Sequence, residues 1–385
     1  MDYIYLDNAA TSFPKPQCVI DSVSAYLSHI GASPARSAHS LSIASGQILY
    51  EARVALAKLL GQSREERVIF GANATMMLNS ALYGILQEND RVVTTSLEHN
   101  SVIRPLMELK NTRHIQVEII QSSPTCAIHL SHLESTLQNA RVCVCVYANN
   151  VSGAVLPIAE IYTLCKKYGV IFILDSSQAI GHLPLSANDA DIICGSCHKG
   201  LYAPSSLGFM SLNPAFDENV LQSFMQGGTG SQSEESIQPR FLPDKYESGT
   251  PNMCAIAGLR AALEWIEQSG GIAQIHARQM DLYRQLYEGL KSISSVLLYE
   301  IESPQCVANV SFNIINASPS QVGLRLDREF GILSRVGLHC SPLTHKSMGS
   351  FECGGSVRLS IGAFNTHAEI EQTLRAIEFL AKVYV

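Results

Sequence analysis

Apolar and polar residues alternate along the chain with two different periods. Short apolar segments rich in β-branched residues, typical of buried strands, occupy residues 67–70, 91–95, 141–147, 170–174 and 191–194. Stretches with helical spacing lie between them, at residues 75–86 and 158–168. This alternation predicts a βα domain with a largely parallel sheet.

The clearest βα unit runs from Ile158 to Leu174. Its amphipathic helix ends at Gly169, a common helix terminator, and the apolar strand VIFIL follows at once. Asp175 therefore falls at the carboxyl end of a strand. In open α/β sheets that edge is where ligands bind.

The pattern changes after about Gly258, where long helical stretches surround a strand at 308–314 and precede a last helix at 366–382. We expect a second, α+β domain there. The predicted division assigns residues 15–257 to a large domain, and residues 1–14 together with 258–385 to a smaller one. Within the large domain, the turn-rich segment 227–243 is expected to be a long exposed loop, and such loops are usually functional or mobile.

Composition and charge indicate which classes of protein fit this sequence. The 385 residues are 46% hydrophobic and 16% charged, which indicates a globular protein large enough to bury a cofactor. A net charge of -7 without a cluster of Lys and Arg argues against nucleic-acid binding. No apolar run reaches the ~18 to 20 residues that span a bilayer, and the first residues lack a secretory signal, so we expect a cytoplasmic protein. The eleven cysteines lack zinc-site spacing, so no metal is expected and most should be core thiols.

Two segments that carry chemistry follow neighbouring predicted strands. Lys199 ends the sequence SCHK after the stretch 191–194, and Asp175 follows the stretch 170–174. A lysine at a strand end can form a Schiff base with an aldehyde cofactor, and a nearby aspartate can keep a pyridine nitrogen protonated. On spacing alone, a surface lysine and a helix-capping aspartate fit equally well.

A third segment, GANAT at residues 71–75, follows a strand and opens a helix. The unpaired N–H groups of a helix start suit a phosphate, although a plain N-cap at Asn73 or Thr75 explains the same pattern. Together with the lysine and the aspartate, this segment fits a single phosphate-bearing cofactor that the protein binds at three points. His99, at another strand end, could stack on that cofactor, shuttle a proton or be structural.

The segment RVGLHCSP sets Cys340 apart from the expected core thiols. Gly and Pro predict a loop, in which a nearby Arg or His would favour the nucleophilic thiolate. Arg358 lies on a later apolar strand, and its guanidinium can hold a carboxylate in two hydrogen bonds. An exposed loop thiol and a solvated arginine are the simpler alternatives.

The chain resembles the class V aminotransferase family, and within it the group II, selenocysteine lyase-like cysteine desulfurases. The segments that carry the resemblance follow in the expected order: YLDNAATS, PARSAHSLS, NATMMLN, SLEHNSVIRP, YANNVSGAVLPI, LDSSQAIGHLPL, CGSCHKGLYAP, YESGTPN, RVGLHCSP and VRLSIGAFNTHAEI. The resemblance implies the type I fold of transferases that depend on pyridoxal 5'-phosphate (PLP). That fold has a seven-stranded, mostly parallel sheet in a large domain and a smaller α+β C-terminal domain. It also implies a homodimer with active sites at the subunit interface.

The resemblance also implies roles for individual residues. Lys199 would form the Schiff base with PLP, His99 would stack on the ring, and Asp175 would pair with its nitrogen. The other cofactor contacts implied are Gln178 and Asn150 at the ring oxygen side, with Ala74, Thr75, Ser196, His198 and a second subunit's Thr250 at the phosphate. The substrate residues implied are Arg358 at the carboxylate, Arg36, His39 and Arg335 at the mouth of the site, and Cys340 as sulfur acceptor.

The implied activity converts L-cysteine to L-alanine and leaves the sulfur on Cys340 as a persulfide for a sulfur-acceptor protein. Selenocysteine lysis, or another class V aminotransfer or epimerisation in which Cys340 is idle, is the alternative among enzymes. A sulfur-relay or assembly scaffold is the alternative outside them. Two features depart from the family: Met76 replaces an acidic residue, and His345 and Lys346 replace an apolar continuation of the cysteine loop. The short loop resembles the group that passes sulfur on through a partner or a rearranged loop.

Overall fold

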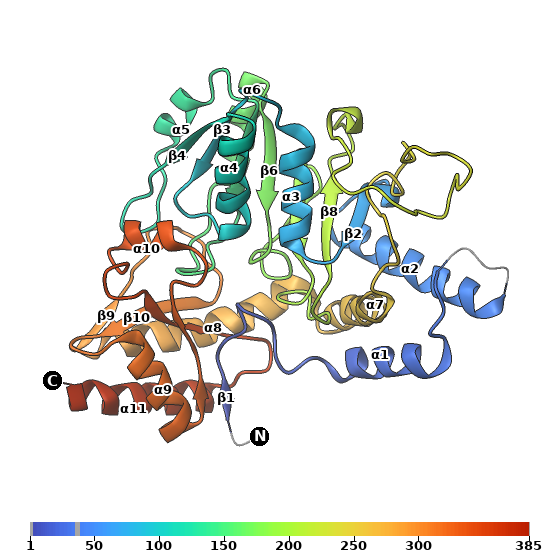
Figure 1. Cartoon of the computed structure of the whole chain (residues 1–385). Helices are drawn as coiled ribbons and strands as arrows, with labels where there is room; N and C mark the ends of the chain where they lie inside the picture. The colour runs from blue at the N-terminus through green and yellow to red at the C-terminus, as the bar shows by residue number, and fades with distance from the viewer. Residues whose placement is uncertain (1–2, 35–38, 385) are drawn as a thin grey trace.

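A computed structural model describes residues 3–34 and 39–384, and its centre is a seven-stranded sheet (Figure 1). The strand order is β2-β8-β7-β6-β5-β3-β4, and β8 alone runs antiparallel to its neighbours. The strands are β2 (Val68–Gly71), β3 (Arg91–Thr95), β4 (Gln116–Ile120), β5 (Val142–Val146), β6 (Ile171–Asp175), β7 (Ile192–Ser196) and β8 (Gly208–Leu212). The expected α/β fold with a mostly parallel sheet is confirmed.

Helices cover both faces of this sheet because its strands are apolar on both sides. In β5, Val142 and Val144 join the core under α3 (Ala74–Ile85) and α4 (Asn100–Thr112). Cys143 and Cys145 point to the opposite core, which contains Cys165 of α6 (Ile158–Tyr168). Alternate side chains of one strand thus pack into the two cores on opposite faces of the sheet. The other helices that belong to this part are α1 (Gln17–His29), α2 (Ser40–Leu59), α5 (Leu130–Thr136) and α7 (Met253–Gln268).

The second half of the chain builds a four-stranded antiparallel sheet in the order β12-β13-β10-β9. Its strands are β9 (Val296–Leu298), β10 (Asn309–Ile314), β12 (Arg335–Gly337) and β13 (Ser356–Ser360). The helices of this region are α8 (Gly271–Lys291), α9 (Pro319–Phe330), α10 (Pro342–Met348) and α11 (His367–Tyr384). Figure 1 shows this layer beside the tip of β6, with both chain ends on its side.

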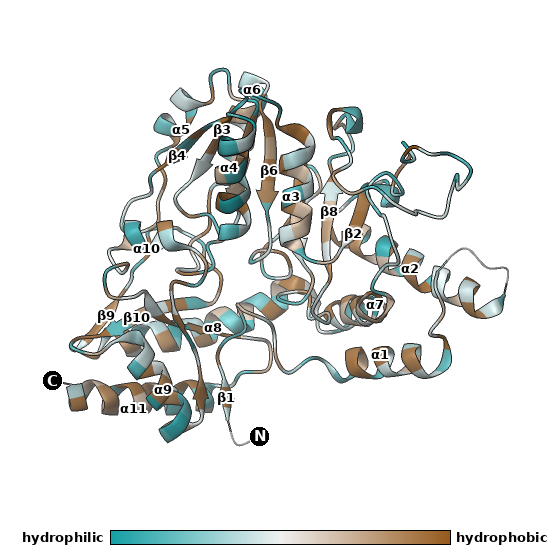
Figure 2. Ribbon diagram, in the orientation of Figure 1, coloured by the Kyte–Doolittle hydropathy of each residue, from teal (hydrophilic) through white to brown (hydrophobic). Residues whose placement is uncertain are grey.

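The N-terminal segment belongs to the same region. β1 (Ile4–Tyr5) pairs in parallel with β11 (Ile332–Leu333), and Asp7 bridges to Ser360 at the end of β13. Apolar residues of β1, α8, β10 and α11 share one buried cluster, and Figure 2 shows hydrophobic residues in brown along α11. The chain start therefore lies against strands formed by residues more than 300 positions later.

Most predicted elements agree with the structure within two residues. The strand expected at 308–314 is β10, and the last helix is α11. The segment 227–243 is indeed a mostly exposed stretch without helix or strand, between the short 3-10 helix η2 (Glu218–Val220) and α7. A second 3-10 helix, η1 (Glu65–Arg67), precedes β2. None of the helices in the described ranges is long and apolar enough to cross a membrane.

Candidate active site

Lys199 lies in the turn that follows β7, at the edge of the sheet where the parallel strands end. The turn is anchored through the carbonyl of His198, which accepts hydrogen bonds from the Ser12 backbone at 3.1 Å and from Lys15 Nζ at 2.8 Å. Burial lowers the pKa of Lys199 to about 8, and the charges of Arg358 and Arg335 act in the same direction. Attraction to Asp175 and Cys340 partly opposes that shift. A lysine of this kind is a usable amine nucleophile near neutral pH.

Asp175 is the last residue of β6 and is only 3% exposed. β6 pairs with β7 so that Asp175 lies opposite Cys194, which brings its carboxylate to the strand end that precedes Lys199. Its Oδ1 accepts the Ser177 backbone N–H at 2.9 Å. The predicted convergence of Lys199 and Asp175 is therefore present.

His99 caps the start of α4, where its Nδ1 accepts the Ser101 N–H at 3.0 Å. Burial lowers its pKa to about 4, with Lys199 adding to the shift and Asp175 opposing it. Because the imidazole feels both groups, it lies in the same pocket as they do. It is neutral at physiological pH, which suits stacking better than ion pairing.

The first turn of α3 lies where the sequence predicted an anion-binding helix start. Asn73 is the N-cap, and its side chain accepts the Met76 N–H at 2.9 Å, which leaves Ala74 and Thr75 in the first turn with outward N–H groups. Gly208 of β8 packs directly under this turn, since a Cβ there would lie 2.5 Å from the Ala74 nitrogen. Helix start and strand can approach this closely only because residue 208 has no side chain.

Two buried polar atoms just after the ends of β6 and β7 have no hydrogen-bond partner within the described part of the chain: Ser177 Oγ and His198 Nδ1. Ser196, the last residue of β7, is buried beside them in sequence, and burial lowers the pKa of His198 to about 4. Buried polar atoms of this kind normally have a partner. They fit a bound group that carries a phosphate and a ring.

The structure gives Asn150 and Gln178 different contacts from the ring-oxygen contact expected for them. Asn150 Nδ2 donates to the His339 carbonyl at 2.7 Å, and its Oδ1 accepts from Ser341 Oγ at 2.6 Å, so its amide brackets Cys340. Gln178 Nε2 donates to the Ala9 carbonyl at 2.9 Å. Both side chains tie the strand ends to the C-terminal and N-terminal segments, and their contact with a cofactor stays a prediction.

Cys340 is exposed at the mouth of the site, in the loop between β12 and α10. His339 and Cys340 both have positive φ, 49° and 58°, a conformation that non-glycine residues seldom adopt. The Cys340 carbonyl accepts the Asn100 N–H at 2.8 Å, which fixes the loop to the start of α4 beside His99. The expected loop cysteine thus lies next to the start of α4, which His99 caps.

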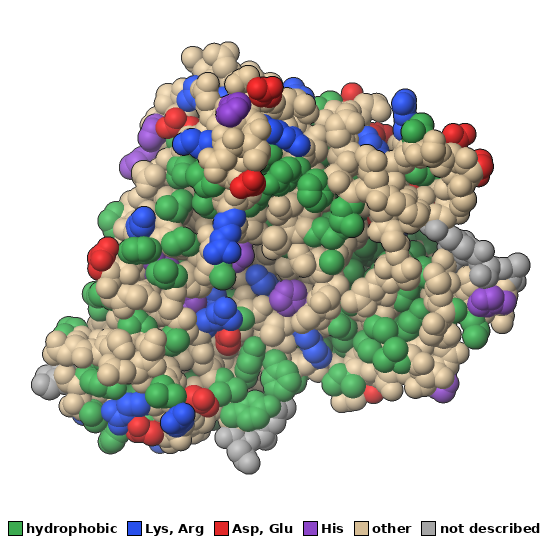
Figure 3. All heavy atoms as spheres, viewed as in Figure 1, with side chains coloured by type: hydrophobic (Ala, Val, Ile, Leu, Met, Phe, Trp, Pro, Cys, Tyr) green, Lys and Arg blue, Asp and Glu red, His purple; other side chains and the backbone are tan. Residues whose placement is uncertain are grey.

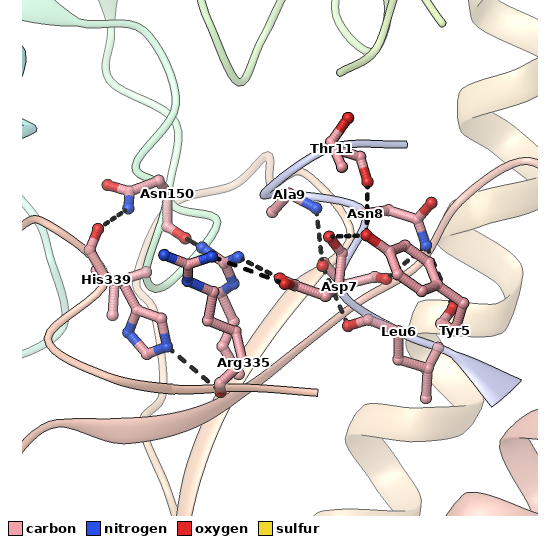
Figure 4. Close-up of polar contacts among 12 residues, drawn as sticks. Tyr5, Leu6, Asp7, Asn8, Ala9, Thr11, Asn150, Arg335 and His339 are labelled. Atoms are coloured by element: carbon pink, nitrogen blue, oxygen red, sulfur yellow. Dashed lines mark hydrogen bonds and ion pairs between the residues drawn. The ribbon is translucent and has the colours of Figure 1, made fainter. Parts of the chain in front are cut away.

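Arg358 and Arg335 lie opposite each other on β13 and β12, and Asp7 lies between their charges. Arg358 is 2% exposed; its Nη2 is 2.8 Å from Asp7 Oδ1 and its Nη1 donates to the Asn150 carbonyl at 2.8 Å. Arg335 Nη1 lies 3.9 Å from Asp7 Oδ2, and Figure 4 shows its side chain pointing toward Asp7. Two like charges that face each other on paired strands repel unless a counter-charge lies between them, and Asp7 supplies that counter-charge.

Two of the remaining predicted residues lie on exposed parts of the chain. Thr250 is exposed in the loop before α7. His39 is an exposed N-cap of α2, whose start lies at the outer edge of the molecule, away from the tip of β6 (Figure 1). Arg36 lies outside the described residues. The face in Figure 3 is hollowed near its middle, where histidines and cationic side chains gather.

Sequence reasoning assigned no role to two acidic residues of the site, Asp7 and Glu98. Asp7 stands in the motif YLDNAATS, but nothing local in that motif shows that it faces Arg358. Glu98 is fully buried; its Oε1 accepts from Thr95 Oγ1 at 2.6 Å and from the Val146 N–H at 3.1 Å. Burial raises its pKa to about 8, and the nearby Asp175 adds to the effect. In the sequence, a role for Glu98 was indicated by its position next to His99 at a strand end.

Comparison with known proteins agrees with this geometry. The sequence model of the class-V aminotransferases matches residues 4–373. Relatives named probable cysteine desulfurase include one from Methanothermobacter thermautotrophicus, 29% identical over 99% of this chain and 95% of the relative, and one from Chlamydia muridarum, 30% identical over 99% and 96%. The apo structure of a cysteine desulfurase from Thermococcus onnurineus superposes with a TM-score of 0.92 at 28% identity, covering 99% of this chain and 95% of that one. This chain belongs to the class-V aminotransferase family.

Proposed function

We propose that this protein is a PLP-dependent cysteine desulfurase that converts L-cysteine to L-alanine and collects the sulfur on Cys340. One observation carries the proposal: the Asn100 N–H bonds the Cys340 carbonyl and Arg358 bonds the Asn150 carbonyl at 2.8 Å each. These bonds hold the cysteine loop and the arginine at the sheet edge where paired strands β6 and β7 end, before Lys199. An amine for the cofactor, an acid for its ring, cations for a carboxylate and a thiol for sulfur therefore share one pocket. The relatives' names point to the same reaction.

The chain's residues fit PLP. The first turn of α3 at Ala74 and Thr75, with Ser196 and His198, would hold the phosphate, and the unpartnered His198 Nδ1 supports this. Asp175 would pair with the ring nitrogen, His99 would cover the ring, and Lys199 would hold the aldehyde carbon as a Schiff base. When bound, PLP supplies an aldehyde and an electron-accepting ring.

The protein's own groups handle the amine and the proton. Lys199, with its lowered pKa, can act as an amine and can hold the proton taken from the substrate Cα. The Asp175 carboxylate would keep the ring nitrogen of bound PLP protonated. Arg358 has Nε buried without a partner among the described residues, which leaves it donor capacity for the substrate carboxylate.

Cys340 performs the sulfur step. Its thiolate sulfur forms a bond to the sulfur of the substrate while the Cβ–S bond of the substrate breaks. The bonding electron pair stays with the three-carbon fragment, which takes up a proton and leaves as alanine. The product on the protein is a persulfide. Burial lowers the pKa of the neighbouring His339 to about 2, so its ring stays neutral beside the thiol.

A homodimer completes the proposed site. Large apolar side chains are exposed on α1 and α2, with Ile20, Leu27, Ile43 and Tyr50 each at least half exposed. Patches of this kind mark protein interfaces. A second copy seated there would supply its Thr250, and the α2 start with His39, to the partner's pocket.

The test is an assay of purified, PLP-loaded protein with cysteine and with selenocysteine. The proposal predicts equal amounts of sulfide and alanine from cysteine in the presence of a thiol reductant, and loss of both in Cys340→Ser. Selenide from selenocysteine but no sulfide from cysteine would instead indicate a selenocysteine lyase. Amino transfer without sulfide would indicate another class V reaction, and the absence of any turnover or PLP absorption would indicate a scaffold.

A further inference from the structure

Two buried histidines stand directly behind the cysteine loop. Nδ1 of His339 lies 3.1 Å from Nε2 of His345, and the two rings stack with centroids 5.3 Å apart at 25°. On the far side, Nδ1 of His345 lies 2.7 Å from Oγ of Ser350. His339 is 6% exposed, and His345 and Ser350 are completely buried. These residues link α10 and the turn after it to the residue that precedes Cys340.

The Arg335 carbonyl at one end of this series of hydrogen bonds fixes the direction of each bond in it. Nε2 of His339 lies 3.4 Å from the Arg335 carbonyl, which can only accept, so Nε2 carries the proton. In a neutral ring Nδ1 is then an acceptor, so His345 donates from Nε2 and in turn accepts from the Ser350 hydroxyl. Burial and the charge of Arg358 lower the pKa of both histidines, His345 to about 4, which keeps both rings neutral. Neither of these two rings has a nitrogen left to take a proton from Cys340.

The same loop has a backbone that needs external support. His339 and Cys340 are consecutive non-glycine residues with positive φ, and Gly337 before them has φ 101°. On one side the loop is held by Asn150 and by the Asn100 N–H. On the other side the side chain of His339 is held by His345. Since the Ser350–His345 pair is rigidly buried, the loop is clamped between the large sheet and α10.

We propose that the Ser350–His345–His339 chain positions Cys340 for sulfur transfer, with His345 as a positioning residue rather than a catalytic one. The inference rests on the proposed desulfurase function and adds to it a reason for the unusual residue His345. A thiol on a clamped loop meets the substrate sulfur in one geometry, and small misplacements of reacting groups slow a reaction strongly. Sulfur then leaves from a fixed loop, so the acceptor must approach Cys340.

The test compares His345→Leu and His345→Gln in the PLP-loaded dimer. The Gln side chain amide can donate to Nδ1 of His339 as Nε2 of His345 does, whereas Leu fills similar space without a donor. We expect His345→Leu to lower kcat for sulfide release at least tenfold, with KM for cysteine and the cofactor spectrum within twofold of wild type. His345→Gln should recover kcat to within threefold. His132→Leu, on the exposed side of α5, is the control for loss of a histidine.

Hydrogen–deuterium exchange gives a readout that does not depend on turnover. The Ser341 N–H donates to the Leu338 carbonyl inside the loop. In His345→Leu a peptide covering residues 336–342 should exchange at least tenfold faster than in wild type, and in His345→Gln at the wild-type rate. If His345→Leu does not fold, Ser350→Ala can replace it, because it removes only the hydroxyl that donates to His345. Ser350→Ala should also lower kcat and speed exchange of this peptide, both to a smaller extent.

The outcomes separate this inference from the proposed function. A wild-type protein that releases no sulfide overturns the desulfurase proposal, and the exchange rates then still decide whether the histidine chain holds the loop. An active wild type with unchanged kcat and unchanged exchange in His345→Leu overturns the positioning role. Equal losses in the Leu and Gln variants also overturn it, because the donated hydrogen bond would then be irrelevant.

Discussion

At the scale of single residues, burial sets the protonation of the groups that the proposed chemistry needs. Lys199 has its pKa lowered to about 8 from an ordinary value near 10.5, so a substantial fraction is neutral amine at physiological pH. His99 in the same pocket is kept neutral with a pKa of about 4. The pocket thus contains an available amine and an uncharged ring, the two states that a Schiff base and ring stacking require.

Replacement of Lys199 by Ala should abolish the covalent attachment of PLP. No second lysine is expected to substitute, because the His198 carbonyl already fixes Lys15 by a hydrogen bond of 2.8 Å. Borohydride reduction of wild-type protein followed by peptide mass spectrometry should find the cofactor on Lys199 alone. A labelled peptide that contains a different lysine would contradict the assignment.

Replacement of Arg358 by Lys keeps the charge but removes the planar fork. Lys cannot bond the Asn150 carbonyl and Asp7 and also hold a carboxylate, so we expect KM for cysteine to rise about tenfold or more, equivalent to ~1.4 kcal/mol or more. Steady-state kinetics over a range of cysteine concentrations measure it. An unchanged KM would assign the carboxylate to Arg335 instead, whose side chain is more exposed.

At the scale of elements, the strand ends account for what the sequence could predict about the site. Lys199, Asp175 and His99 each follow an apolar strand, and parallel topology brings such ends to one edge without further information. The contact between Asp7 and Arg358 joins residues 351 positions apart and depends on the two-residue strand β1. No local pattern specifies the pairing of so short a strand. The bonds from Asn150 to the cysteine loop likewise depend on how two layers dock.

Glu98, at the junction of β3 and β5, should make stability depend on pH. Its folded-state pKa is raised to about 8, against about 4.3 in an unfolded chain. Between these values the unfolded state gives up a proton that the folded state keeps, so folding stability falls as pH rises and levels off above pH 8. Relative to Glu98→Gln, the wild type should lose about 1.4 kcal/mol per pH unit in that window. Denaturant unfolding of both proteins at pH 5.5 and pH 8 measures this, and a difference that does not change with pH would refute it.

At the scale of the whole molecule, the sequence predicts the alternation of elements better than their assembly. The exposed apolar residues of α1 and α2 have ordinary helical spacing, which does not reveal whether a face packs inside the chain or against a second copy. The division into residues 15–257 and residues 1–14 with 258–385 stays a prediction. The pairing of β1 with β11 supports it, because the chain start then belongs with the C-terminal layer.

A dimer predicts a solution mass of twice the 41.9 kDa of one chain by light scattering. Ile43→Asp places a charge on the exposed face of α2 and should yield monomers that bind PLP more weakly, since Thr250 of a second copy would be missing. Leu324→Asp on α9 makes the same change from an exposed apolar residue to aspartate elsewhere and serves as control. A wild-type monomer with full activity would contradict the shared site.

Cys340 is the residue that we propose to receive the sulfur of cysteine. The most direct measurement is mass spectrometry of the PLP-loaded protein after brief exposure to cysteine without reductant, with the modified peptide mapped. The exposed Cys18 and Cys353 serve as internal controls for non-specific oxidation. We expect one additional sulfur atom on the peptide that contains Cys340, and none on that peptide in Lys199→Ala. Persulfide on another cysteine, or wild-type sulfide release by Cys340→Ser, would contradict it.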